Sequence, residues 1–331
     1  MAKAKQTRTE PMTMEDLAAL AGVSKITVSR ALRDSPLVRE SVRERIKALS
    51  AEHGYRLNAA ARSLRTRRAH SITAALEMNP SADRPLSEPL ALMMIGGMLQ
   101  AIATRGYRLV LTTRSEALSS NVLDTEGIIL GGLGANDEAI RQMQRFNLPL
   151  VVWGSSRPAF DNVVFLGSDN LAGGRLVGEH LVGLGRRRIL FLGNTAHAEV
   201  AERLAGLTAA IAGQGVEVRQ SPCAFGREAA RAAVLDELAS GAKFDAVVGC
   251  SDPIALGALD VLREAGLDVP GDVAVTGYDD ATREPMLTSV RQDWDLAGTM
   301  LAGMMFDLLA GQDVVSGKLP VDLIVRASTA G

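Results

Sequence analysis

The strongest constraint on the fold is a regular alternation of short apolar runs with longer amphipathic stretches, which starts at residue 71 and continues to residue 309. The short runs have the length of buried strands, and the longer stretches have the period of helices. Strands are predicted at Ser71–Leu76, Arg108–Thr112, Gly127–Leu130, Leu150–Trp153, Val163–Phe165, Arg188–Gly193, Ala246–Gly249 and Val273–Gly277. Helices are predicted at Leu90–Arg105, Asp137–Phe146, Asn170–Leu184, Val200–Gly213, Arg227–Ala239, Pro253–Ala265 and Leu296–Leu309. Strands that alternate with helices in this way predict an α/β body, with parallel sheets covered on both faces.

The N-terminal 65 residues follow a different pattern, in which two short helical stretches flank the turn Gly22-Val23-Ser24. Gly22 suits the left-handed backbone that ends a helix, and Ser24 can cap the helix that follows. A third amphipathic stretch runs from Val42 to His53. This arrangement predicts an all-α helix-turn-helix head. The apolar residues expected on the inner face of its first two helices are Leu17, Leu20, Ala21, Val28, Ala31 and Leu32.

The outer face of the second predicted helix carries side chains that can read DNA, because the start of this helix in a helix-turn-helix reaches base edges in the major groove. Lys25 can donate to guanine, Ile26 can contact a thymine methyl, and Arg30 can bridge guanine or grip phosphate. Thr27 and Ser29 are short enough to serve phosphates. The alternative is an ordinary helical hairpin with a polar outer face.

Charge is distributed unevenly along the chain. Residues 1–70 contain 15 Lys and Arg against 7 Asp and Glu, whereas the remaining residues contain 21 against 31. A basic head on an acidic body favours a polyanionic partner held at one end, and therefore DNA reading over the plain hairpin. A solvated basic tail is the alternative explanation of the charge.

Few residues suggest enzyme chemistry. The glycine-rich run Gly131-Gly132-Leu133-Gly134 lacks the third glycine of a dinucleotide-binding loop, and the sequence has no phosphate loop or nucleophile elbow. The 4 histidines lack metal-ligand spacing. The sequence therefore predicts no catalytic residue, no metal and no cofactor, which leaves a hydrolase or kinase as the weaker alternative.

The chain also shows no sign of export or membrane insertion. Its 2 cysteines, Cys223 and Cys250, are too few for a disulfide framework, and residues 1–11 do not form a signal peptide. No apolar run approaches the roughly 20 residues that a membrane helix needs. We therefore expect a cytoplasmic, nucleoid-associated protein with no membrane partner.

Several short motifs in the head together resemble the lactose/galactose repressor (LacI/GalR) family. They are Ala18, Ala21-Gly22-Val23-Ser24, Thr27-Val28-Ser29-Arg30-Ala31-Leu32, Gly54-Tyr55, Asn58, Ala61 and Leu64. In that family a hinge helix after the head pairs with its twin across a dimer and enters the minor groove. The resemblance implies that Asn58 contacts phosphate, that Ala61 lies on the minor-groove face and that Leu64 wedges into the central base step. Such a wedge costs a few kcal/mol of unstacking and gains contacts; a linker residue packed on the body is the alternative for Leu64.

The resemblance extends through the body. It rests on Gly167-Ser168-Asp169-Asn170-Leu171-Ala172-Gly173-Gly174, Arg203-Leu204-Ala205-Gly206, Ser251-Asp252, Gly277-Tyr278-Asp279-Asp280 and Arg291-Gln292-Asp293-Trp294. It implies a periplasmic-binding-protein-like body of two parallel-sheet subdomains, with the chain crossing between them near 166, 294 and 323. The expected division is a disordered basic tail (1–12), the helix-turn-helix (13–57), a hinge helix and linker (58–69) and a ligand-binding and dimerisation domain (70–331). Within the last, one subdomain spans about 70–166 and 294–323, and the other about 167–293 and 324–331.

The same resemblance indicates a ligand site between the two subdomains. Arg203 is the leading candidate, because a guanidinium there can hold sugar hydroxyls or a carboxylate. Asp279 follows a predicted strand and can accept two hydroxyls, while Phe225 and Trp294 either offer ring faces to a ligand or belong to the core. Ser251 and Glu77 are weaker candidates. Asp169 and Asp252 follow strands and are expected to cap helices at least as readily as to contact ligand.

These features predict a homodimeric transcriptional regulator, most plausibly a repressor of a carbohydrate-utilisation operon. Each head is expected to read one half of a near-palindromic double-stranded operator. A small effector, a sugar or a sugar acid, is expected to control DNA binding from the cleft, either as inducer or as co-repressor. A periplasmic transport receptor shares the pattern of the body, but not the head.

Overall fold

The computed structural model describes residues 12–55, 69–76, 89–119, 124–132, 137–160, 162–281 and 283–330. The chain divides into two compact units, Met1–Ala69 and His70–Gly331, which we call the head and the body. None of the helices in these described stretches is long and apolar enough to cross a membrane.

The head consists of α1 (Met14–Ala21), α2 (Lys25–Ala31) and α3 (Glu40–Glu52). Its turn has the predicted chemistry: Gly22 adopts a left-handed φ of 63°, and the Ser24 side chain caps α2 by accepting from the Thr27 amide at 3.2 Å. Met12 packs against the head core. The fully buried centre of the core consists of Leu17, Val28, Ala31 and Ile46.

One predicted member of this core is wrong, because Leu20 is 46% exposed. The buried residues of α1 are Leu17, Ala18 and Ala21, so the inner stripe of this helix is centred on Ala21. At 100° per residue, Leu20 lies about 100° away from that centre, which places it at the edge of the stripe.

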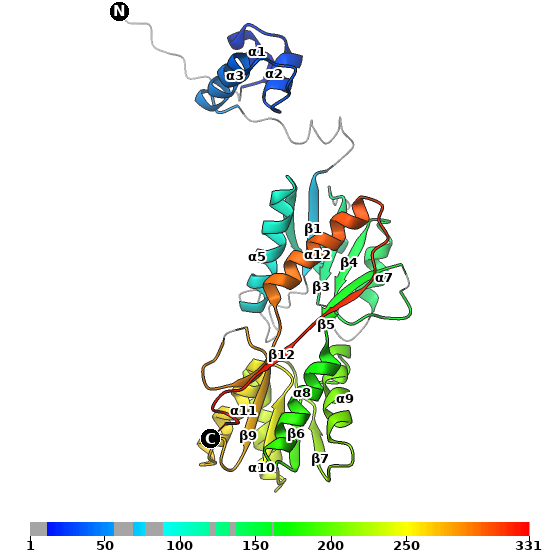
Figure 1. The fold of residues 1–331 in the computed structure, drawn as a ribbon, viewed down its shortest axis with the longest axis vertical. Helices are drawn as coiled ribbons and strands as arrows, with labels where there is room; N and C mark the ends of the chain where they lie inside the picture. The colour runs from blue at the N-terminus through cyan, green and yellow to red at the C-terminus, as the bar shows by residue number, and fades with distance from the viewer. Residues whose placement is uncertain are drawn as a thin grey trace, which may run out of the picture. The chain divides into compact units, whose positions relative to one another are not determined.

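The body contains two sheets, one in each half of the body in Figure 1. Each sheet has six strands. In the first, the order is β11 (Gly317–Leu319), β5 (Val164–Ser168), β4 (Leu150–Trp153), β3 (Gly127–Gly131), β1 (Ser71–Leu76) and β2 (Arg108–Thr113), and all neighbours are parallel. In the second, the order is β12 (Asp322–Ile324), β10 (Thr288–Arg291), β9 (Ala274–Asp279), β8 (Ala246–Gly249), β6 (Arg188–Leu192) and β7 (Glu217–Ser221). Only the pair β10–β12 is antiparallel among these described strands. The predicted α/β class with parallel sheets is confirmed.

Each sheet has helices on both faces, and each sheet with its helices forms one lobe. The N-lobe holds α5 (Pro89–Thr104) and α12 (Trp294–Leu309), which lie side by side in Figure 1, and on its other face α6 (Arg114–Ser119) and α7 (Glu138–Gln144). The C-lobe holds α8 (Asn170–Gly183), α9 (Ala198–Ile211), α10 (Arg227–Ala239) and α11 (Asp252–Glu264) around a single apolar core.

The chain passes between the lobes three times: after β5, between β10 and α12, and between β11 and β12. These three segments bring strand ends of both sheets to the boundary between the lobes. The predicted domain limits remain a proposal, and the predicted hinge falls outside the described residues up to position 68.

Glycines allow α8 and α9 to touch backbone to backbone. A Cβ on Gly174 would lie 1.9 Å from the Arg203 carbonyl oxygen, and one on Gly206 would lie 2.1 Å from the Leu171 carbonyl oxygen. Both distances are far below van der Waals contact, so side chains at these positions would separate the helices. The contact fixes where α9, and therefore Arg203, lies relative to α8.

We predict that Gly174→Ala lowers the free energy of unfolding of the body by about 2–3 kcal/mol, because the helices must move apart to accept the methyl group. Gly183→Ala is the matched control on the same helix, since nothing lies within 4 Å of the Cβ position of Gly183. Urea unfolding of the full chain, followed by circular dichroism, measures both. Equal effects of the two substitutions would show that the close approach does not constrain the fold.

Candidate functional site

The predicted DNA-contacting residues lie on α2 of the head. Lys25, Ile26 and Arg30 are exposed, with Ile26 at 63%. These three side chains are therefore accessible to a partner. The Lys25 ammonium pairs with Glu15 of α1. Binding to a base or phosphate would therefore exchange one surface ion pair for another contact, at small cost.

Thr27 and Ser29 already have partners within the head. The Thr27 hydroxyl lies 2.9 Å from that of Ser24, and the Ser29 hydroxyl accepts from the Arg33 guanidinium, whose Nε also donates to the Ser29 carbonyl at 2.7 Å. A hydroxyl has one proton and two lone pairs, so each retains capacity for a further bond. Asn58, Ala61 and Leu64 of the predicted hinge, and Glu77 of the predicted ligand site, lie outside the described residues.

A cavity lies at the boundary between the lobes of the body, at the carboxyl ends of the strands of both sheets. It encloses about 580 Å³ of empty space, part of which is open to solvent. Small-molecule sites form where parallel sheets switch direction, beyond the carboxyl ends of their strands. The residues that line it are Gly132, Trp153, Gly154, Gly167, Ser168, Asn170, Glu199, Arg203, Phe225, Asp279, Gln292 and Trp294.

Arg203 is held in this cavity by three contacts. Its Nε donates to Asn170 Oδ1 at 2.9 Å, its Nη1 donates to the Cys250 carbonyl at 2.5 Å, and its guanidinium lies 3.6 Å from the centroid of the Tyr278 ring. Burial raises the pKa of Tyr278 to about 12, so the ring stays neutral and the contact is a cation–π interaction. With Arg203 only 7% exposed, these contacts fix a buried cation while leaving N–H groups for a further acceptor.

Asp279 also lines the cavity, at the end of β9, and its backbone has an unusual φ of 113°. Its Oδ1 accepts from Gln292 Nε2 at 2.6 Å, and Gln292 Oε1 in turn accepts from the Ser168 hydroxyl. This chain of bonds joins the end of β5 in the N-lobe to the end of β9 in the C-lobe. Both ends face the cavity, so polar groups of two lobes converge on one space.

Aromatic rings form two sides of the cavity. Trp153 and Trp294 pack with ring centroids 5.3 Å apart, and Phe225 meets His197 edge-on at 5.0 Å. Trp294 is only 5% exposed, and its indole N–H has no hydrogen-bond partner among the described residues. A buried indole N–H usually finds an acceptor. A ligand oxygen in the cavity would satisfy it.

Ser251 does not line the cavity, although the sequence made it a candidate. It precedes α11 as its N-cap residue and is fully buried, without a side-chain capping bond. Asp169 caps α8 as predicted, by accepting from the Ala172 amide at 3.1 Å. The same expectation is wrong for Asp252, because its carboxyl faces the Ser289 hydroxyl at 2.5 Å instead of the helix amides.

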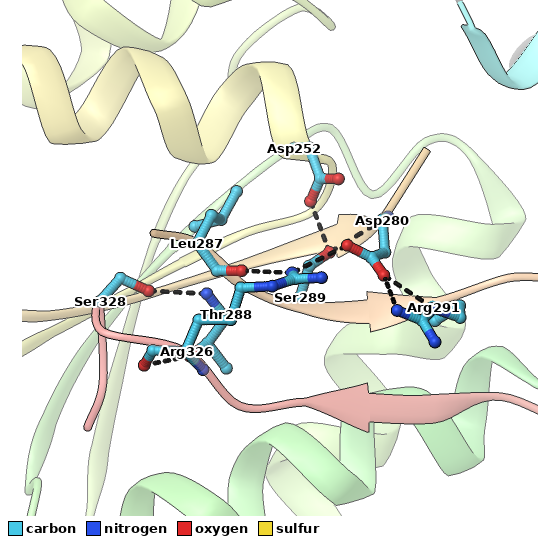
Figure 2. A network of polar contacts seen from close by, with 8 residues as sticks. All are labelled: Asp252, Asp280, Leu287, Thr288, Ser289, Arg291, Arg326 and Ser328. Carbon is cyan, nitrogen blue, oxygen red and sulfur yellow. Dashed lines mark hydrogen bonds and ion pairs between the residues drawn. The ribbon is translucent and has the colours of Figure 1, made fainter. Parts of the chain in front are cut away.

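Behind the cavity, a network anchors the crossing segments to the C-lobe (Figure 2). Asp280 Oδ2 accepts from Arg291 at 2.7 Å, and its Oδ1 pairs with Arg326 Nη1 at 2.8 Å. Arg291 ends β10, just before the second crossing, and Arg326 follows β12, just after the third, so one carboxylate holds the C-lobe ends of both crossing segments. Burial, together with the nearby Asp279, raises the pKa of Asp252 to about 8, so this carboxyl is neutral at pH 7.

Sequence reasoning missed several residues of the cavity. Glu199 lies one helical turn before Arg203 on α9, and this i, i+4 spacing could have identified it once Arg203 was placed. Asn170 and Gln292 lie inside motifs that the family resemblance quoted, but their type alone gives no sign of a cavity. Trp153 ends a predicted strand, whereas Ser168 lies in a quoted motif beyond the predicted strand Val163–Phe165. Their place at the cavity became visible only with the sheet order.

Comparison with known proteins agrees with this architecture. Residues 13–58 match the family model described as bacterial regulatory proteins, lacI family, and residues 179–329 match a periplasmic binding protein-like domain. The transcriptional regulator CelR of Thermobifida fusca is 33% identical over 336 residues, covering 96% of this chain and 98% of that protein.

Two solved structures extend the comparison to the fold. A CelR–cellobiose complex superposes with a TM-score of 0.72 at 31% identity, covering 96% of this chain and 99% of that one. A lac repressor dimer bound to operator and the anti-inducer ONPF gives a TM-score of 0.85 at 26% identity, covering 97% and 100%. With a matching head and full-length relatives of the same architecture, the chain belongs to the lacI family of bacterial regulatory proteins.

Proposed function

We propose that this chain is a homodimeric repressor of a carbohydrate-utilisation operon, and that a saccharide bound in the cavity controls its affinity for operator DNA. The observation that carries the proposal is the cavity itself, where a fixed guanidinium, a carboxylate and paired indole rings converge. Hydroxyl groups need both donors and acceptors, and the apolar face of a sugar ring packs on an aromatic face.

The head supplies the DNA-binding half of this function. Lys25, Ile26 and Arg30 are proposed to contact bases, and Thr27 and Ser29 to contact phosphates. Asn58, Ala61 and Leu64 are proposed to form the minor-groove hinge, on the family resemblance. A regulator of this kind acts on the chromosome, so we expect it in the cytoplasm with the nucleoid. We propose no enzymatic activity.

The charges of the cavity favour an uncharged saccharide over a sugar acid. Its charged lining groups are the carboxylates of Glu199 and Asp279 and the guanidinium of Arg203, and two of the guanidinium's donors are already engaged by Asn170 and Cys250. An anionic ligand would therefore meet a net negative lining. Cellobiose, the ligand of the related CelR structure, is an uncharged disaccharide.

The N-lobe offers a surface for the dimer. Leu92 and Leu99 of α5 are 53% and 51% exposed, and Val110 and Leu111 of the neighbouring edge strand β2 are 41% and 45% exposed. Leu92 and Leu99 are seven residues apart and share one face of α5, whereas Val110 and Leu111 point to opposite faces of β2. An exposed apolar helix face beside a sheet edge is a surface that oligomers bury. A palindromic operator requires two heads, and this face can join them.

We predict that Arg203→Ala still binds operator but no longer responds to saccharide, because the ligand loses charge-assisted bonds of about 1.5–3 kcal/mol each. The measurement is fluorescence anisotropy of the full chain on a DNA fragment from its own upstream region, with saccharides titrated in. A thermal melt within a few degrees of the wild type shows that the fold is intact. An unchanged saccharide response would remove Arg203 from the site.

We predict that the wild type binds an uncharged sugar at least tenfold more tightly than the matching aldonic acid, and that Glu199→Gln reduces this preference about tenfold. Removal of one nearby negative charge weakens the repulsion by about 1–3 kcal/mol. Calorimetric titrations with glucose and gluconate, cellobiose and cellobionate, and maltose and maltobionate measure it. Tighter binding of any acid than of its parent sugar contradicts the charge argument.

We predict that Leu99→Asp converts the dimer to monomer and weakens operator binding at least a hundredfold, because a charge in the apolar interface lacks a partner. Leu235→Asp is the matched control, since Leu235 of α10 is also 50% exposed but lies in the C-lobe. Light scattering after size exclusion gives the mass of each. If Leu99→Asp stays dimeric while Leu235→Asp does not, the interface lies on the C-lobe.

A further inference from the structure

A single carboxylate oxygen receives hydrogen bonds from both lobes beside the cavity. The Ser155 hydroxyl, which follows β4 in the N-lobe, donates to Glu202 Oε2 on α9 of the C-lobe at 2.9 Å. Asn170 Nδ2, at the start of α8, lies 3.4 Å from the same oxygen. Neither Ser155 nor Glu202 is among the residues that line the described cavity.

The position of this bond makes it sensitive to the separation of the lobes. Ser155 is only 5% exposed, so water does not compete freely for its hydroxyl, and a bond to an ionised acceptor in such a site is stronger than a surface pair. Hydrogen bonds lose their strength beyond about 3.5 Å. A small opening of the lobes at this point would therefore break it.

Glu202 is also linked to Arg203, the proposed ligand-binding cation, through the side chain of Asn170. Asn170 places its amide nitrogen toward Glu202 and its carbonyl oxygen toward Arg203 Nε, at 2.9 Å. The same nitrogen also donates to the Ser168 carbonyl at 3.2 Å. Because an amide side chain donates from one end and accepts at the other, Glu202 and Ser168 together favour the Asn170 orientation that holds Arg203.

We propose that Ser155 and Glu202 form a latch that stabilises the closed arrangement of the lobes and, through Asn170, positions Arg203. Both are positioning residues, because they act on the cavity without contacting its content. Only the last step rests on the proposed function, since it assumes that Arg203 binds the effector. The latch itself is a property of the ligand-free body.

The test measures the distance between the lobes without any ligand. Nitroxide labels are attached at Arg145→Cys, which follows α7 in the N-lobe, and at Ala239→Cys, which ends α10 in the C-lobe; both positions are exposed. Cys223 and Cys250 are replaced by alanine, and the labelled full chain is mixed with a tenfold excess of unlabelled chain, so that one protomer per dimer carries labels. Pulsed electron paramagnetic resonance then gives the distance distribution.

Ser155→Ala is expected to shift or broaden the distribution relative to the latched protein. The matched control is Ser240→Ala, whose hydroxyl donates at 2.8 Å to the Glu237 carbonyl within the C-lobe; it should leave the distribution unchanged. Identical distributions for Ser155→Ala and Ser240→Ala would overturn the latch. Because no saccharide is present, failure of the saccharide proposal would not alter this result.

A double-mutant cycle covers the possibility that Glu202→Ala destabilises the protein by itself. Ser155→Ala, Glu202→Ala and the double variant are unfolded in urea, and their unfolding equilibrium constants are compared. We expect a coupling of about three- to tenfold between the two positions, the size of one buried hydrogen bond. Strictly additive effects would contradict a direct bond between the lobes.

Discussion

The site depends above all on how one buried guanidinium is held. Arg203 would be costly to bury without partners, and the fold supplies an amide, a carbonyl and a ring face in fixed positions. The glycine contacts between α8 and α9 fix the position of the Arg203 backbone relative to α8. The bond from Asn170 fixes the orientation of the guanidinium. Each of these partners comes from a different element of the C-lobe. The position of the cation in the cavity therefore depends on the packing of the whole lobe.

The crossing segments give the body its two-lobed mechanics. Only three segments of chain join the lobes, which leaves the lobes free to move relative to each other. The Asp280 network holds two of these segments to the C-lobe. Gln292 and Trp294, which line the cavity, lie on the second crossing just beyond this anchor. The proposed effector would therefore contact a segment that joins the lobes, which is what control through the angle between them requires.

The sequence allowed most of the fold to be predicted, because the body alternates strongly apolar strands with amphipathic helices. The elements it missed lack that signal: β7 is the polar edge strand Glu217–Ser221, β10 has a single large apolar residue, β11 and β12 have three residues each, and α6 has only 6. In the site, the placement of Arg203, Asp279, Phe225 and Trp294 on one cavity agrees with the resemblance. Ser251 does not line the cavity, and Glu199, which does, was missed. Which residues face a cavity depends on helix rotation and sheet order, and local sequence pattern does not determine these.

Asp279 and Asp280 are consecutive residues with opposite tasks: the first faces the cavity, and the second anchors the crossings, with both backbones at positive φ. Any substitution at Asp279 that relaxes its backbone would disturb the anchor next to it. Glu199 lies on a helix and Trp153 at the end of a strand, both with ordinary backbone conformation. Substitutions there would not disturb the anchor. Substitutions at Glu199 and Trp153 can therefore change which sugar the cavity accepts, whereas Asp279 must be kept.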